Sequence, residues 1–110
     1  MEIRDNKDFC IITPLCNILE GNRIAKIFDR IKTETRRVAI DLNHVQNCSI
    51  EFIEALNSIQ TKKIGIFNIP SDIFVLFNIM NIDKNLNLFV SELDFEENSR
   101  KLINRRFTVL

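Results

Sequence analysis

The stretch from Val38 to Leu56, with the sequence VAIDLNHVQNCSIEFIEAL, constrains the fold more than any other part of this chain. It is an apolar run that ends in an Asp-Leu pair, followed by a polar loop and an amphipathic helix with a serine at its start. A serine at the N-terminus of a helix lies where backbone amides lack partners and the helix dipole is positive. Ser49 is therefore predicted either to cap this helix or to carry a phosphate group.

Length and composition predict a single domain over residues 1–110. The chain is 45% apolar and carries 15 basic and 15 acidic residues, and a chain of this size buries very roughly 65% of its unfolded surface. Its nine Phe residues are accompanied by no Trp or Tyr. Few side chains are thus of the kind that stack on bases or lie at membrane interfaces, and we expect no nucleic-acid partner.

The N-terminal segment MEIRDNKDF is charged where a secretory signal peptide needs an apolar segment. No window approaches the roughly 18 apolar residues of a membrane span. We therefore predict a cytoplasmic protein that does not insert into a membrane. The three cysteines, Cys10, Cys16 and Cys48, are odd in number and form no CxxC motif, which predicts reduced thiols.

Strand and helix patterns alternate along the chain. The predicted strands cover residues 9–13, 37–42, 63–69 and 86–91, with 2–4 as an outlying strand and 107–110 as a terminal one. The predicted helices cover residues 24–32, 49–60 and 71–80. Asn17 or Asn22 is the predicted cap of the first. A last short helix is predicted to begin with a capping box at Asp94 and Glu97 and to carry Phe95 and Leu102. This alternation is typical of crossover units and a largely parallel sheet.

Residues 73–80 are apolar beyond a single helical stripe. Such a segment fits a helix packed on both sides or a surface for a partner, and we favour packing.

The order of these segments resembles the STAS domain, the family of anti-sigma-factor antagonists. The resemblance is carried by VAIDL, the loop to Ser49, KIGIFNI and FVLFNIMNIDKNLNLFVS, and it spans nearly the whole chain. In that family a D-L-S-x-V-type strand end leads to a D-S-S-G-L-type helix start, whose first serine is phosphorylated by a partner kinase. The resemblance implies an α/β fold with a mainly parallel sheet of four or five strands and about four helices packed largely on one face.

Ser49 falls on the phosphorylated serine of the family if one loop residue is missing here. In that register Cys48 stands where the family has Asp, Ile50 replaces the second serine and Glu51 replaces the glycine. Without the gap, Ile50 falls on the phosphorylated position, and the switch would be abolished.

The resemblance implies a bacterial regulatory module that docks through the helix of Ser49 and is switched by phosphorylation of Ser49. Its implied partner is an anti-sigma factor, a serine kinase with the ATPase fold of histidine kinases, and a PP2C-type phosphatase is a further candidate partner. The implied partner-binding residues are Asp41, Asn43, His44, Asn47, Cys48, Ser49 and Phe52.

Two other functions remain open. One is a constitutive STAS scaffold subunit, which assembles with itself or with a transporter and is never phosphorylated; Cys48 and Glu51 favour it. The other is a small-ligand sensor, which needs a cavity near Asp41.

Each of these residues also has a plain structural interpretation. Ser49 as an N-cap alone contributes ~1 kcal/mol. Asp41, at the end of a strand, could position a nucleotide or a partner's cation, or simply cap a loop, which we favour. Cys48 beside a helix N-terminus could be a reactive thiol with a lowered pKa, or a small, partly buried filler, which we also favour.

Catalysis finds little support in the sequence, and we predict no enzyme and no cofactor. There is no P-loop, and Gly21 and Gly65 are the only glycines, too few for a phosphate cradle. His44 is the only histidine. Tetrahedral zinc sites need paired ligands at short spacing, so His44 and Cys48 do not predict a metal site.

Overall fold

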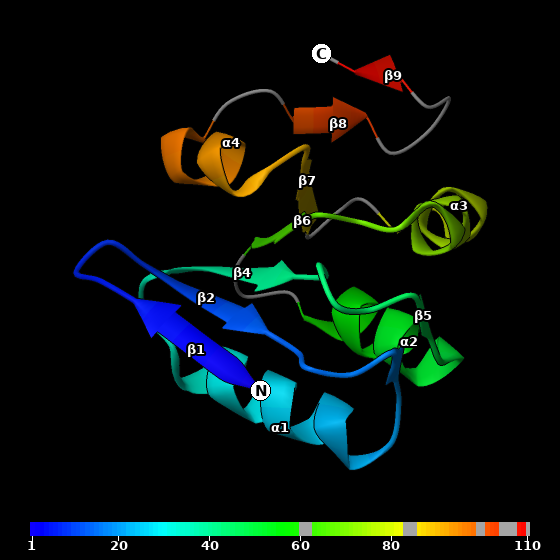
Figure 1. Ribbon diagram of the computed structural model, residues 1–110, viewed down its shortest axis with the longest axis horizontal. Coiled ribbons are helices and arrows are strands. Elements are labelled where there is room, and N and C mark those ends of the chain that lie inside the picture. Colours follow the sequence, from blue (N-terminus) through cyan, green and yellow to red (C-terminus); the bar gives the residue numbers. More distant parts are fainter. Residues whose placement is uncertain (60–62, 83–85, 99–100, 104–107, 110) are drawn as a thin grey trace.

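A mixed β-sheet with helices on both faces forms the protein (Figure 1). The computed structural model describes residues 1–59, 63–82, 86–98, 101–103 and 108–109. In chain order the elements are β1 (Glu2–Asp5), β2 (Phe9–Thr13), β3 (Ile18–Leu19), α1 (Asn22–Thr33), β4 (Arg37–Asp41), β5 (Asn47–Cys48), α2 (Ile50–Ser58), β6 (Ile64–Phe67), α3 (Ser71–Met80), β7 (Leu86–Phe89), α4 (Glu92–Glu97), β8 (Lys101–Ile103) and β9 (Thr108–Val109).

The main sheet has the strand order β1-β2-β4-β6-β7-β8-β9. The four central strands, β2, β4, β6 and β7, are parallel to one another. Strand β1 is antiparallel to β2, and β8 is antiparallel to both β7 and β9. The predicted α/β class with a mostly parallel sheet and four helices is confirmed. The sheet has more strands than the predicted four or five: β8 was not predicted, and β9 lies within the predicted terminal strand 107–110, of which residues 107 and 110 lie outside the described residues.

The short last helix begins earlier than predicted. Ser91 is its N-cap, because the Asp94 backbone N–H donates to Ser91 Oγ at 3.4 Å and Ser91 Oγ donates to Asp94 Oδ2 at 3.0 Å. The predicted capping box at Asp94 and Glu97 is therefore wrong, since Asp94 is already inside the helix. Leu102 lies in β8 rather than in α4.

The start of α1 and the polar loop before α2 also differ from the prediction. Gly21, with φ 65°, is the residue before α1, in a conformation that costs glycine little. Neither Asn17 nor Asn22 is the cap. The loop over residues 43–48 contains β5, which pairs in parallel with β3 in a separate two-stranded sheet.

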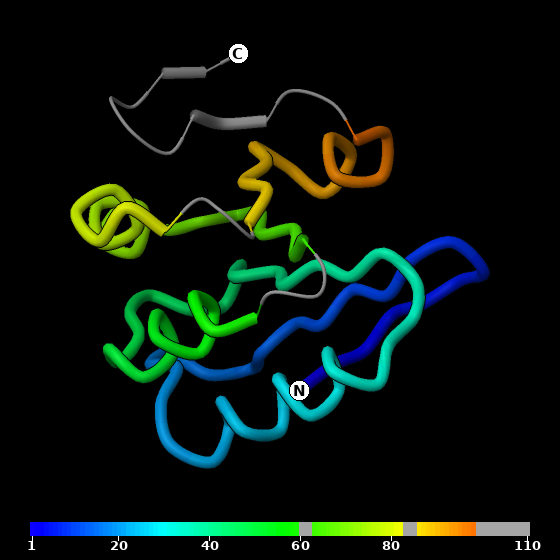
Figure 2. Tube along the Cα trace, turned by 180° about the vertical axis from the view of Figure 1, so that it is seen from behind, coloured from blue at the N-terminus to red at the C-terminus, as the bar shows by residue number. Residues whose placement is uncertain are grey.

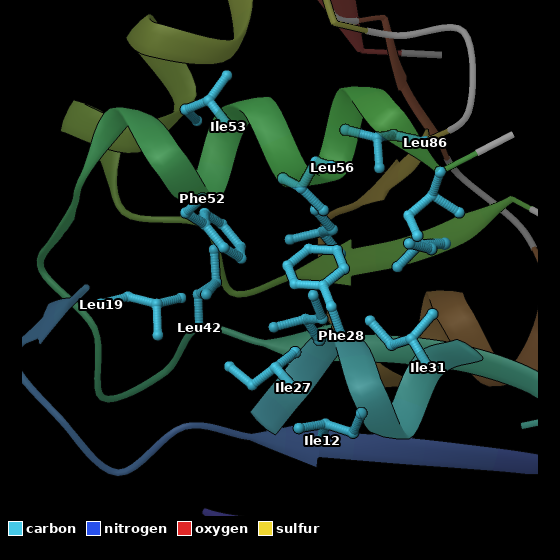
Figure 3. Close-up of a cluster of buried hydrophobic side chains, with 14 of the residues drawn as sticks. Ile12, Leu19, Ile27, Phe28, Ile31, Leu42, Phe52, Ile53, Leu56 and Leu86 are labelled. Atoms are coloured by element: carbon cyan, nitrogen blue, oxygen red, sulfur yellow. The ribbon is translucent and has the colours of Figure 1, made fainter. Parts of the chain in front are cut away.

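One face of the sheet carries the larger part of the core. Side chains of α1, α2 and α3 pack there against alternate residues of the strands, and Figure 3 labels Ile12, Leu19, Ile27, Phe28, Ile31, Leu42, Phe52, Ile53, Leu56 and Leu86. The rings of Phe28 and Phe52 join α1 to α2 with centroids 6.1 Å apart. In both overall views α1 lies beside β1 and β2 (Figures 1 and 2), and α3 lies next to β5 in Figure 1.

The opposite face carries a smaller aromatic cluster under α4. Phe95 of α4 packs there with the buried strand residues Ile11, Ala39, Phe67 and Phe89, and half-buried Phe9 packs against the same cluster. The Phe95 ring rests on Gly65, where an added Cβ would lie 2.8 Å from Phe95 Cδ1. Glycine at this strand position therefore permits the close approach of α4.

Helix α3 does not pack on both sides as predicted. Ile73 and Phe77 are buried, but Val75 is exposed, Ile79 is 73% exposed and Met80 is also exposed. Within the described ranges, none of the helices combines the length and apolar character that crossing a bilayer requires.

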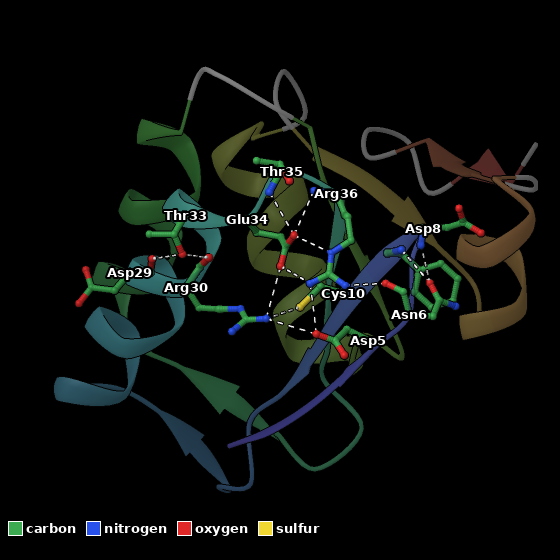
Figure 4. A network of polar contacts seen from close by, with 11 residues as sticks. Asp5, Asn6, Asp8, Cys10, Asp29, Arg30, Thr33, Glu34, Thr35 and Arg36 are labelled. Carbon is green, nitrogen blue, oxygen red and sulfur yellow. Dashed lines mark hydrogen bonds and ion pairs between the residues drawn. The ribbon is translucent and has the colours of Figure 1, made fainter.

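A buried carboxylate ties α1 to β4 and to the β1–β2 turn (Figure 4). Glu34 accepts hydrogen bonds from the Arg36 side chain, with Nε and Nη2 each at 2.8 Å, and from the Thr35 and Arg36 amides at 3.1 Å. Arg30 Nη2 lies 3.4 Å from Glu34 Oε1, and Asp5 contacts both arginines. The Arg36 hydrogen bonds, with smaller contributions from the charges of both arginines, lower the pKa of Glu34 from 4.5 to about 2.

This lowered pKa predicts a loss of stability in acid. A carboxyl whose pKa falls on folding stabilises the native state fully above its unfolded value of 4.5, and this contribution is lost as the pH falls from 4.5 towards 2. We expect the difference in urea midpoint between the wild type and Glu34→Gln to be large at pH 7 and to shrink steadily below pH ~4.5. If the difference in urea midpoint between the wild type and Glu34→Gln were the same at neutral and at acid pH, the lowered pKa of Glu34 would be contradicted.

Candidate functional site

The backbone of Ser49 is fixed between β3 and α2. Ser49 is the N-cap residue of α2, with an extended backbone at φ −80° and ψ 164°. Its N–H donates to the Leu19 carbonyl at 3.0 Å, and its own carbonyl accepts from the Phe52 N–H at 3.2 Å. The prediction that Ser49 begins this helix is confirmed.

The side chain of Ser49 points inward and makes no capping bond. Its Oγ is buried and has no hydrogen-bond partner among the described residues. A buried hydroxyl without a hydrogen-bond partner lowers the stability of the fold by about 1–3 kcal/mol. No hydrogen bond with the described residues holds the Ser49 oxygen in this position. A kinase would reach it only after the side chain rotates about χ1 to another staggered position.

Most of the predicted partner-binding residues lie together in the segment that leads to α2. Asn43, His44 and Asn47 are exposed, and Cys48 and Ser49 are half-buried. All five belong to the segment that joins β4 to α2.

Two exposed apolar residues that were not among the predicted partner-binding residues lie beside this segment. The register of β3 and β5 pairs Ile18 with Asn47, and Ile18 is 48% exposed. Ile50, the first residue of α2, is 50% exposed. A two-residue strand such as β3 has no recognisable periodicity, so sequence reasoning had no signal for the pairing that brings Ile18 here.

Asp41 is buried and anchors the start of the same segment. Its carboxylate accepts from the Asn43 N–H and from Asn68 Nδ2, each at 3.0 Å, and lies 3.4 Å from Thr13 Oγ1. The bond to Asn43 is the loop-capping role that we favoured. Asp41 therefore fixes the loop from inside and offers no free surface.

Arg4 of the edge strand β1 connects Asp41 to α4. Its Nη2 lies 3.5 Å from Asp41 Oδ2 and 2.8 Å from Glu92 Oε1. The hydrogen bond from Arg4 lowers the pKa of Glu92. Nothing in the sequence pattern links β1 to this end of the sheet, because the contact depends on the antiparallel register of β1 and β2.

Phe52 belongs to the core rather than to the surface. Its side chain is fully buried and packs on Phe28. It supports the N-terminal turn of α2 from beneath, so its predicted role as a direct partner contact is corrected.

Cys48 is a partly buried thiol that packs against the core. Burial raises its pKa to about 11, which disfavours the thiolate that a reactive cysteine needs. Both observations favour the filler interpretation over the reactive one.

A groove of about 650 Å³ lies between α1 and α2 and includes Ser49 in its wall. Its lining residues are Glu20, Gly21, Ile24, Ala25, Phe28, Asp29, Lys32, Ser49, Glu51 and Ala55. The groove adjoins the loop surface described above, because both contain Ser49.

Comparison of the chain with models of known protein families finds no match, and comparison with curated proteins finds none either. The STAS resemblance therefore rests on the sequence motifs quoted above.

Proposed function

We propose that the protein is a STAS-type regulatory module that docks on a kinase-like anti-sigma factor through the surface at the start of α2. The observation that carries this proposal is the unbroken order of β4, the loop fixed by Asp41, and Ser49 as the first residue before α2. Exposed polar side chains of the loop lie beside exposed Ile18 and Ile50. A polar rim next to apolar side chains is typical of transient protein interfaces.

Phosphorylation of Ser49 supplies the switch in this proposal. A phosphate adds close to two negative charges and three acceptor oxygens. With the side chain turned outward, the amides of the first turn of α2 favour such a charge, so the fold tolerates it. A partner that covers this end of α2 without a matching cation would have to desolvate the phosphate, which is expensive.

A constitutive scaffold is the second candidate function, and two observations favour it. The hydroxyl of Ser49 is buried, which slows its modification. The exposed apolar residues Val75, Ile79 and Met80 of α3 offer a surface for self-assembly.

A phosphorylation assay separates the two functions. Purified protein is incubated with ATP and any serine kinase that is encoded beside it, and the modified residue is located by mass spectrometry. The switching function predicts one phosphate on Ser49 and none in Ser49→Ala. An active kinase that leaves Ser49 unmodified would favour the scaffold.

A further inference from the structure

We propose that the groove between α1 and α2 binds a basic amphipathic helix of a partner protein. The inference goes beyond the proposed function by naming the chemistry of the partner segment. It rests on that function only in assigning a binding role to α2, and it requires no phosphorylation.

The floor of the groove is apolar and shaped by small side chains. Ile24 and Phe28 of α1 lie one turn apart, and Ala25 of α1 and Ala55 of α2 line the same space. Alanines at these positions leave room that larger side chains would fill. The residues of α1 in the groove run from Ile24 to Lys32, about 12 Å along the helix axis at 1.5 Å per residue, which suits two turns of a partner helix.

The charged lining of the groove is mostly acidic. Glu20, Asp29 and Glu51 contribute three carboxylates, and Lys32 contributes one cation, so three negative charges and one positive charge give a net charge of −2. The cations Arg23 and Lys26 of α1 line a different pocket, together with Pro14 and Leu15. The field in the groove thus favours a cationic segment.

Two carboxylates at one end of the groove give this segment a specific anchor. Glu51 lines the groove at the N-terminal end of α2, beside Ser49, and Glu20 lines it just before α1. A lysine of the incoming helix can donate hydrogen bonds to these two carboxylates, which also balance its charge.

Two synthetic helical peptides test the inference. Both carry leucines at i and i+4; one has lysines at the flanking positions and the other has glutamates there. Each is titrated into the full ¹⁵N-labelled chain and followed by chemical-shift changes. We expect the lysine peptide to bind about tenfold more tightly than the glutamate peptide, with shifts centred on Ala25, Glu51 and Ala55.

Variants of α2 provide the matched comparison. Glu51→Lys reverses a charge inside the groove, and Glu54→Lys makes the same change on exposed residue 54, which does not line it. Glu51→Lys should weaken the lysine peptide about tenfold, and Glu54→Lys should leave its affinity unchanged. Ala55→Leu, which fills the groove, should abolish binding while native chemical-shift dispersion is kept.

Equal affinity of the two peptides, equal effects of Glu51→Lys and Glu54→Lys, or shifts confined to other surfaces would each overturn the inference. Ser49→Asp separates this inference from the proposed switch. An added negative charge should not weaken the cationic peptide, whereas it should abolish binding to the kinase. If the peptide result fails, the kinase result still tests the switch, and if the kinase result fails, the peptide result still tests the groove.

Discussion

Replacement of Ser49 by aspartate is expected to abolish binding to the proposed partner, a kinase-like anti-sigma factor, whereas replacement by alanine should preserve it. Aspartate places a fixed negative charge at the start of α2, and a partner that covers this turn must desolvate it. Alanine removes a hydroxyl that makes no hydrogen bond among the described residues, so neither the fold nor the interface loses a bond. Calorimetric titration of each purified variant with any such kinase encoded beside the protein measures the difference.

Ser58→Asp provides the control for charge alone. Ser58 is exposed at the C-terminal end of α2, where its Oγ donates to the Ala55 carbonyl at 2.8 Å. The same substitution there changes the net charge equally but lies away from the loop that leads to Ser49, so binding should persist. Equal binding by Ser49→Asp and Ser49→Ala would contradict the switch, and the constitutive scaffold would then be favoured.

The sequence predicts the main elements because their patterns are long enough to read. The large apolar residues of α1 recur with the helical period and are all buried, and the predicted apolar runs become the buried strands β4 and β6. Prediction fails where an element has only a few residues. The pairing of β3 with β5 depends on two residues from each strand, and such a pattern is too short to carry a period.

The candidate site shows a similar division between local and tertiary information. The loop from Asp41 to Ser49 could be predicted because strand, loop and helix follow one another along the chain. The approach of Arg4 and Ile18 could not, because each reaches the site through strand pairing. The inward rotamer of Ser49 depends on how α2 packs, which periodicity alone does not determine.

Phe95→Ala is expected to lower the free energy of unfolding by about 3–5 kcal/mol, the usual cost of deleting a fully buried phenylalanine side chain. Phe95 is 2% exposed, and its ring contacts Phe9, Phe67 and Phe89 with centroids 5.6, 6.0 and 5.7 Å away. The loss is large against the roughly 5–15 kcal/mol that stabilises a typical domain. Chemical denaturation at neutral pH measures it directly.

The position of α4 explains why so much depends on one side chain. Helix α4 has six residues, too few to be stable alone. The ring of its Phe95 fills the space above Gly65. Leu93→Ala is the matched control, because Leu93 lies on the same helix, is 55% exposed and should cost less than ~0.5 kcal/mol. If Phe95→Ala and Leu93→Ala were equally mild, α4 would not depend on this cluster for its attachment to the sheet. A large loss for Phe95→Ala alone would mean that the aromatic cluster beneath α4 holds the second face of the sheet together.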